Sequence, residues 1–193
     1  MTAQTARVHE RLVNGVAVDK LYATIDAIKE DPEIAKFNFR ITNQWINGGH
    51  NHTTVKDFYG AKQTHKHVKP FELEADEPPL LLGEDKGANP VEHLLNALVS
   101  CVTSSIVYHG AATGIEIKGI QSRVEGDLDL RGFLGITKTV PVGYQEIRLF
   151  FKIDADITDE EKEDLIDLGK KYSPVFNTVF ENKTSVVALL DTE

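Results

Sequence analysis

The chain has 193 residues, of which 41% are hydrophobic and 26% are charged, and this is enough to bury one core of an ordinary soluble protein. Its 30 acidic and 21 basic residues give a net charge of −9, which argues against binding to nucleic-acid phosphates or to an anionic membrane surface. We therefore expect small-molecule or protein partners.

Other features narrow the expected location. No apolar run approaches the roughly 20 residues that cross a bilayer, and the polar start "MTAQTARVHERLVNG" is unlike a signal peptide. A cytoplasmic protein is the prediction. Cys101 is the single cysteine, so an internal disulfide, a Cys-rich zinc site and a CxxC redox pair are excluded.

The first half of the chain predicts one helix and then extended segments. Leu21, Ile25 and Ile28 recur at helical spacing, and the helix is expected to end at Asp31-Pro32. The segment "FNFRITNQW" alternates in polarity and, with the turn Asn47-Gly48-Gly49 and "HNHTTVKDF", predicts a β-hairpin. A further extended stretch, "HKHVKPFELEADEPPLLL", leads into the loop "GEDKGAN".

A long apolar helix is predicted from Pro90, with Asn89 as its N-cap. Its apolar residues cover more than one face, and Gly110 and Gly114 bracket its end. We expect a helix of about 20 residues at the centre of the core.

The second half predicts two strands, a helix and a last strand. The segments "IQSRVEGDLDL" and "YQEIRLFFKIDADI" alternate in polarity, and a capping box from Thr158 to Glu161 opens a helix. "SPVFNTVF" is a turn or short helix, and "TSVVALL" is a closing strand. The order of elements predicts an α+β fold in which two helices pack on curved antiparallel sheet.

Two pairs of histidines are candidate metal ligands. His50 and His52, like His65 and His67, are spaced by two, which places both members of a pair on one face of a strand. If the strands were neighbours, four imidazoles could meet and bind zinc, copper or nickel. Their neighbours are the polar residues of a solvated strand, with no carboxylate evidently fixed beside them. We therefore expect no structural metal, and no cofactor is predicted.

Cys101 has two interpretations when taken alone. It lies about three turns into the predicted helix, where Leu94, Ala97, Leu98 and Ser105 are its neighbours. A cysteine in such surroundings is usually a small core residue. A reactive thiolate would need a cation or hydrogen-bond donors from elsewhere in the protein.

The segment "GANPVEHLLNALVSC" resembles the signature of the OsmC/Ohr family of thiol-dependent peroxidases, in which the peroxidatic cysteine follows the Asn of a G-x-N-P segment by twelve residues. "SPVFNTV" is similar to the stretch that the family's second cysteine begins, and the resemblance extends from about Phe37 to Leu190. It implies an intertwined homodimer with each active site at the subunit interface. Residues 1–36 are then an N-terminal helical extension and residues 37–193 an OsmC-like domain.

The resemblance also implies roles for individual residues. Cys101 would attack a hydroperoxide and become a sulfenic acid. Glu92 lies at the family's acidic place in the first helical turn, although the best-studied members have this glutamate one residue earlier, where this chain has Val91. Ser173 stands where the resolving cysteine would be and cannot form a disulfide, so an external thiol would complete turnover.

The family's activating arginine has no clear match. Arg40 and Arg131 are the candidates, and the glycines of "RGFLG" favour Arg131 because they suggest a shaped loop. The alternative for either residue is an ordinary surface pair with a carboxylate.

The sequence thus predicts a single-cysteine protein of oxidative-stress defence that reduces organic hydroperoxides. One alternative is a non-catalytic binding protein that uses the interface pocket for a small apolar ligand, and another is a metal-binding variant. Thiol reactivity separates the first two hypotheses, and bound metal would identify the third.

Overall fold

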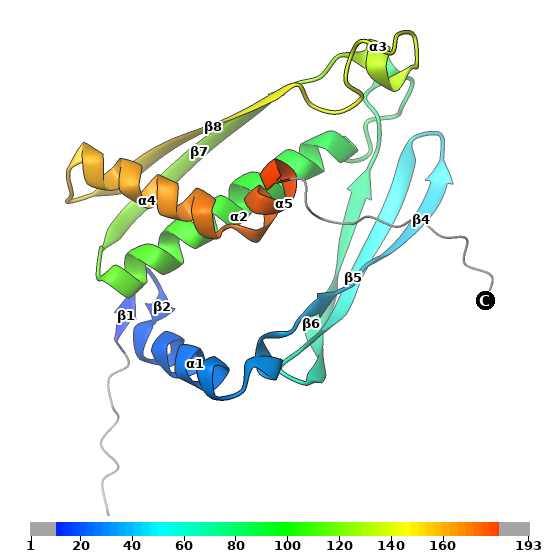
Figure 1. The fold of residues 1–193 in the computed structure, drawn as a ribbon. Coiled ribbons are helices and arrows are strands. Elements are labelled where there is room, and N and C mark those ends of the chain that lie inside the picture. Colours follow the sequence, from blue (N-terminus) through cyan, green and yellow to red (C-terminus); the bar gives the residue numbers. More distant parts are fainter. Residues whose placement is uncertain (1–10, 182–193) are drawn as a thin grey trace, which may run out of the picture. The chain divides into compact units, whose positions relative to one another are not determined.

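The computed structural model describes residues 11–181 (Figure 1). The strand predicted for "TSVVALL" lies outside these residues. The chain divides between Leu94 and Leu95 into two compact units.

The first unit begins with a short hairpin and a helix. Asn14 and Gly15 both have positive φ, as a two-residue hairpin turn requires. The helix predicted from Leu21, Ile25 and Ile28 is confirmed. The elements are β1 (Leu12–Val13), β2 (Val16–Ala17), α1 (Val18–Glu30) and the 3-10 helix η1 (Pro32–Ala35).

An antiparallel sheet forms the rest of this unit. β5 lies at its centre, with β3 and β4 on one side and β6 on the other. The hairpin predicted around Asn47-Gly48-Gly49 is confirmed, with Gly48 at φ 56°. The strands are β3 (Asn38–Phe39), β4 (Thr42–Asn47), β5 (His50–Gly60) and β6 (Gln63–Ala75).

Both neighbours of β5 are irregular at the level of Lys56. On one side, β3 ends at Phe39 and β4 begins only at Thr42. On the other side, Val55 pairs with Phe71 but Asp57 pairs with Lys66, so β6 bulges between these two pairs. The regular pairing of β5 with its neighbours is therefore interrupted on both sides at Lys56.

A buried carboxylate organises the loop after β6. Asp76 is 1% exposed and accepts hydrogen bonds from the backbone N–H groups of Glu77, Glu84 and Lys86. These three bonds hold the pKa of Asp76 below its ordinary value against the opposing effect of burial. The loop contains the 3-10 helix η2 (Pro79–Leu81) and leads to Asn89.

The second unit packs helices on a two-stranded sheet. α2 and α4 lie on one face of the β7–β8 pair, and α5 follows α4 (Figure 1). This confirms the predicted α+β class, with two helices against antiparallel sheet. The elements are α2 (Pro90–Thr113), whose residues before Leu95 belong to the first unit, β7 (Ile117–Asp127), α3 (Leu130–Phe133), β8 (Glu146–Ala155), α4 (Asp159–Tyr172) and α5 (Pro174–Glu181).

One stripe of α2 forms the centre of this core. Leu98, Val102 and Ile106 are fully buried and recur every four residues, as one helix face requires. They cluster with Leu165 of α4 and with inward residues of β8. The helix approaches α4 so closely that a Cβ on Gly169 would lie 2.5 Å from Cγ1 of Ile106.

α2 also has the length and composition of a helix that could cross a membrane. An 18-residue window reaches a mean hydropathy of 1.3, and 28% of that window is buried. The sequence prediction overlooked this because polar residues such as Asn96 and Ser100 interrupt the apolar run. A single helix of this kind is weak evidence for a membrane span, because the core helix of a soluble protein can have the same length and hydropathy. The buried stripe of α2 packs against β8 and α4.

Candidate functional site

The start of α2 is fixed by reciprocal capping. Asn89 accepts a hydrogen bond from the N–H of Val91 through Oδ1 at 3.0 Å, which confirms it as the N-cap. The N–H of Asn89 donates to Oε2 of Glu92 at 2.9 Å, and its side-chain amide donates to Glu77. Glu92 therefore has a structural role at the helix start.

Cys101 lies on the border of the buried stripe of α2. It is a free, half-buried cysteine directly before fully buried Val102. Helical spacing places it on the same face as Leu94, Ala97 and Tyr108, all of which are exposed. Within residues 11–181 the thiol makes no hydrogen bond or ion pair.

Ser173 lies between α4 and α5 and is fully buried. Its Oγ accepts a hydrogen bond from the N–H of Phe176 at 3.1 Å, which caps the start of α5. The side-chain amide of Asn177 donates to the carbonyls of Lys170, Lys171 and Ser173. The "SPVFN" segment is therefore a tightly bonded helix junction in which the hydroxyl serves as a cap.

The structure does not bring the three predicted site residues together within one chain. Glu92 precedes Cys101 by nine residues of α2, a rise of about 14 Å. The N–H, Nε and Nη2 of Arg131 all donate to the Asp129 carboxylate. This pairing lowers the pKa of Asp129 to about 2.

Both arginine candidates thus have a carboxylate partner of their own. Arg131 pairs with Asp129, and Arg40 pairs with Asp57 on β5. Both are surface ion pairs, the alternative interpretation of these arginines. A role for either at the thiol stays a prediction.

Residues 83–188 match the family of OsmC-like proteins. The match covers more than half of the chain. The chain belongs to the OsmC-like protein family. None of the curated proteins matches the sequence.

Solved structures share the fold of this OsmC-like chain at low identity. An OsmC-like protein from Mycoplasma pneumoniae is 21% identical, with 74% of this chain and 86% of that chain covered and a TM-score of 0.56. An OsmC-like protein of unknown function from Vibrio cholerae is 11% identical, with 74% and 94% covered and a TM-score of 0.57. An organic hydroperoxide resistance protein from Legionella pneumophila is 18% identical, with 75% and 91% covered and a TM-score of 0.53.

The two histidine pairs of the OsmC-like chain lie far apart, although their strands are neighbours. His52 is opposite Glu74, whereas His65 is opposite Phe58, six residues further along β5 and about 20 Å away. His67 contacts the Phe58 and Phe71 rings. The four imidazoles therefore do not meet, because the register separates them.

Carboxylates do lie beside His50 and His52, contrary to the sequence interpretation. Nδ1 of His52 is 2.7 Å from Glu74 and its Nε2 is 2.9 Å from Glu72, while His50 is 2.8 Å from Glu74. The Glu74 hydrogen bond, followed by smaller contributions from Glu72, raises the pKa of His52. Among the residues that the structure describes, no three His, Cys, Asp or Glu side chains are arranged to hold a metal ion.

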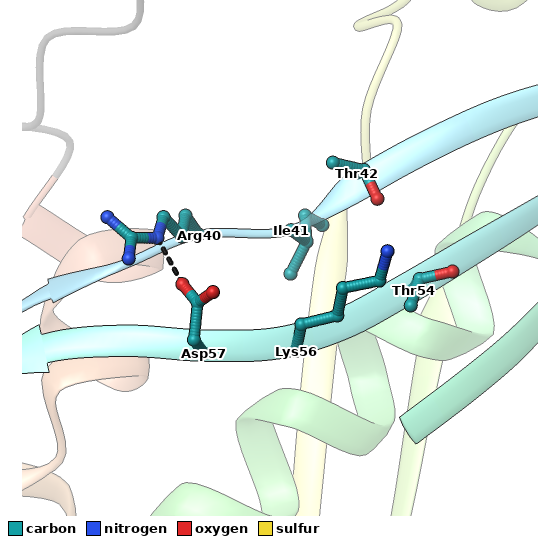
Figure 2. A pocket seen from close by; sticks show the side chains of 6 residues that line it. All are labelled: Arg40, Ile41, Thr42, Thr54, Lys56 and Asp57. Atoms are coloured by element: carbon teal, nitrogen blue, oxygen red, sulfur yellow. Dashed lines mark hydrogen bonds and ion pairs between the residues drawn. The ribbon is translucent and has the colours of Figure 1, made fainter. Parts of the chain in front are cut away.

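Sequence reasoning also missed a small hollow on the sheet of the first unit. Its volume is about 160 Å³, and Figure 2 shows the six side chains around it. No short sequence pattern indicates it, because polar and apolar residues continue to alternate through Arg40 and Ile41. The lining residues are Arg40, Ile41, Thr42, Thr54, Lys56 and Asp57.

Proposed function

We propose that this OsmC-like protein reduces organic hydroperoxides through Cys101, with an external thiol as reductant. The observation that carries the proposal is the place of Cys101, a free and half-buried thiol twelve residues after the capped Asn89 of α2. Membership of the family and the fold shared with a hydroperoxide resistance protein support it.

The proposed reaction has three steps. The Cys101 thiolate attacks the terminal oxygen of the hydroperoxide, the O–O bond breaks, and the alcohol leaves after it takes up a proton. The sulfur is oxidised to a sulfenic acid. One external thiol then displaces hydroxide to give a mixed disulfide and water, and a second thiol releases the Cys101 thiol as the external disulfide forms.

An external reductant is required in this proposal because the second position of the family's cysteine pair is occupied by Ser173. A buried hydroxyl that caps α5 cannot form a disulfide. Cys101 is the only cysteine in the chain, so the resolving thiol must come from another molecule.

We propose a homodimer with the active site at the interface. Support comes from the large apolar side chains left exposed on the sheet of the first unit, where Phe39 is 74%, Trp45 66% and Ile41 63% exposed. The exposed face of α2 beside Cys101 has the same character. A second subunit would cover such surfaces and could supply the cation that a reactive thiolate needs. We place this dimer in the cytoplasm as a soluble protein.

The experiment that tests the reaction traps the oxidised thiol. Purified protein is mixed with stoichiometric cumene hydroperoxide and a dimedone-type probe, and labelled peptides are identified by mass spectrometry. We expect one probe on Cys101 and none on the Cys101→Ser variant. Absence of the label at peroxide concentrations that leave the fold intact would reject the proposed peroxidase activity.

A non-catalytic binding protein is the second candidate. The observation that favours it is that each arginine candidate is already paired with an aspartate, Arg40 with Asp57 and Arg131 with Asp129. In that case Cys101 would be unreactive toward hydroperoxide, and a small apolar ligand would occupy the interface.

A further inference from the structure

Helix α1 carries an apolar stripe that the described part of the chain leaves partly open. Val18, Leu21, Ile25 and Ile28 recur at intervals of three and four residues, so they lie on one face of the helix. Val18 is buried and Leu21 and Ile28 are half-buried, but Ile25 is 37% exposed. The stripe is therefore least covered near its middle.

Contacts at both ends hold α1 in place. At its start, the N–H of Val18 donates to the carbonyl of Arg11 at 3.0 Å, just before β1. At its end, Asp31 pairs with Lys62 in the turn between β5 and β6. A helix of 13 residues is marginal in water by itself, and among residues 11–181 α1 buries only Val18. Burial of the rest of the stripe requires a surface from outside the described chain.

A second copy of the same helix is complementary to the open stripe. The spacing of three, four and three residues is the same when it is read from either end. In an antiparallel pair around a twofold axis, Leu21 of each copy would therefore lie opposite Ile25 of the other. Tyr22 and Thr24 flank this axis and are uncharged, so the pair brings no like charges together at its centre.

The charges of α1 also suit an antiparallel pair. The first turn carries Asp19 and the last turn carries Lys29. Antiparallel packing places the first turn of one copy beside the last turn of the other, so opposite charges and opposite ends of the helix dipole meet. Lys20, Asp26 and Glu30 lie away from the stripe and are exposed, as a solvated face requires.

This contact adds to the surface already assigned to the homodimer. Two helices of 13 residues bury far less than the roughly 1,000 Å² that a stable specific interface needs, so they would not hold a dimer alone. α1 leads through η1 to Phe37 and Phe39, which stack at 5.9 Å and are both exposed. The stripe and the exposed apolar sheet are thus continuous along the chain, which favours one partner for both.

We propose that α1 pairs with α1 of the partner subunit across the twofold axis of the homodimer, with Leu21 and Ile25 at the centre of the contact. This inference rests on the homodimer proposed above. α1 lies outside residues 83–188, which match the family, so the contact is a property of the N-terminal extension.

The test is a cross-link across the proposed axis. Thr24→Cys in a Cys101→Ser background is treated with a short bis-maleimide, and the product is analysed by denaturing gel and mass spectrometry. Most of the protein should become a covalent dimer, because the two introduced thiols lie close to the axis. The matched control is Ala23→Cys in the same background, which is also exposed but lies on the opposite side of the helix and should stay uncross-linked.

A substitution in the stripe gives a second readout. Ile25→Asp should weaken dimerisation about tenfold or more in sedimentation equilibrium, because a charge replaces an apolar side chain at the centre of the contact. Ala23→Asp introduces the same charge on the opposite face and should leave the dimer dissociation constant within about twofold of the wild type.

Light scattering on the untreated protein separates this proposal from the homodimer itself. A dimer in which Thr24→Cys cross-links no better than Ala23→Cys overturns the α1 pair and leaves the homodimer standing. A dissociation constant unchanged by Ile25→Asp also overturns the pair, because the stripe would then be covered by the chain's own residues or by another protein. A well-folded monomer overturns both proposals.

Discussion

The reactivity of Cys101 depends on groups outside its own helix. The thiol lies too deep in α2 for the helix dipole to favour the thiolate, since that effect fades beyond the first turn. Arg40 and Arg131, the two candidate cations, each pair with an aspartate. A cation or hydrogen-bond donor that activates the thiol would therefore have to come from outside α2.

Ser173→Ala should lower the free energy of unfolding by about 1–2 kcal/mol, the usual effect of losing a helix N-cap. The reason is that the N–H of Phe176 would lose its acceptor in a buried place. Urea denaturation measures the change. Ser104→Ala, at an exposed position of α2, is the control and should have no such effect; equal stability of the Ser173→Ala variant and the wild type would contradict the capping role.

His52 should titrate above pH 6.5, because its imidazolium donates to Glu74 and Glu72. The interaction stabilises the fold fully below pH 6.5 and is lost as the pH rises through the raised pKa. Ring NMR signals followed from pH 5 to 9 would measure it. Glu74→Gln should move the His52 pKa back toward 6.5, whereas Glu116→Gln should not; an unchanged pKa in the first variant would contradict the pairing.

Local contacts could be predicted from the sequence, and distant ones could not. Asn89 and Thr158 cap helices within three residues of themselves, so their roles follow from short spacings. Arg131 and Asp129 are two residues apart, so their ion pair could be predicted equally well. The His52–Glu72 contact depends on the β5–β6 register, which no short pattern in the sequence specifies.

At the scale of elements, the contact between α2 and α4 depends on a missing side chain. Gly169 is buried, and an added Cβ would lie 2.5 Å from Ile106 and 3.2 Å from the Val102 carbonyl. The two helices can approach this closely only because residue 169 is glycine. Leu98, Val102 and Ile106 then pack against α4 and β8.

Gly169→Ala should therefore destabilise the protein by about 1–3 kcal/mol through overpacking, although alanine is the better helix former. Chemical denaturation monitored by circular dichroism tests this. Gly119→Ala on β7 is the matched control, because its added Cβ would meet nothing closer than 4.0 Å. A Gly169→Ala variant as stable as the control would show that the helices are not tightly packed there.

The order and type of elements followed from hydrophobic periodicity, and the irregularities did not. α1, the β4–β5 hairpin, β7, β8 and α4 lie where the patterns predict them. The bulge opposite Lys56 and the loop held by Asp76 depend on backbone hydrogen bonds between residues distant in sequence. The hollow at Lys56 therefore became visible only in three dimensions.

At the scale of the whole molecule, the chain leaves more apolar surface exposed than a monomer of its size is expected to tolerate. All six residues of β4 are exposed, including Trp45 and Ile46, and the second unit exposes Phe133 and Ile136. Exposed apolar patches of this kind mark interaction surfaces. They support the proposed homodimer.

Light scattering in dilute buffer should give about twice the 21.4 kDa mass of the chain. The reason is that the exposed apolar faces need a partner. A well-folded monomer at micromolar concentration would contradict this architecture. Trp45→Lys should shift the equilibrium toward monomer, whereas Lys20→Glu on the exposed face of α1 should not.

The most direct test of the proposed activity counts alcohol molecules released from cumene hydroperoxide. Without an added thiol, the wild-type protein should form one cumyl alcohol per chain and stop, because Ser173 cannot resolve the sulfenic acid at Cys101. With dithiothreitol it should turn over many times above the uncatalysed rate, and Cys101→Ser should do neither. Alcohol formation by the wild type no greater than that of Cys101→Ser, in the presence and absence of dithiothreitol, would contradict the account.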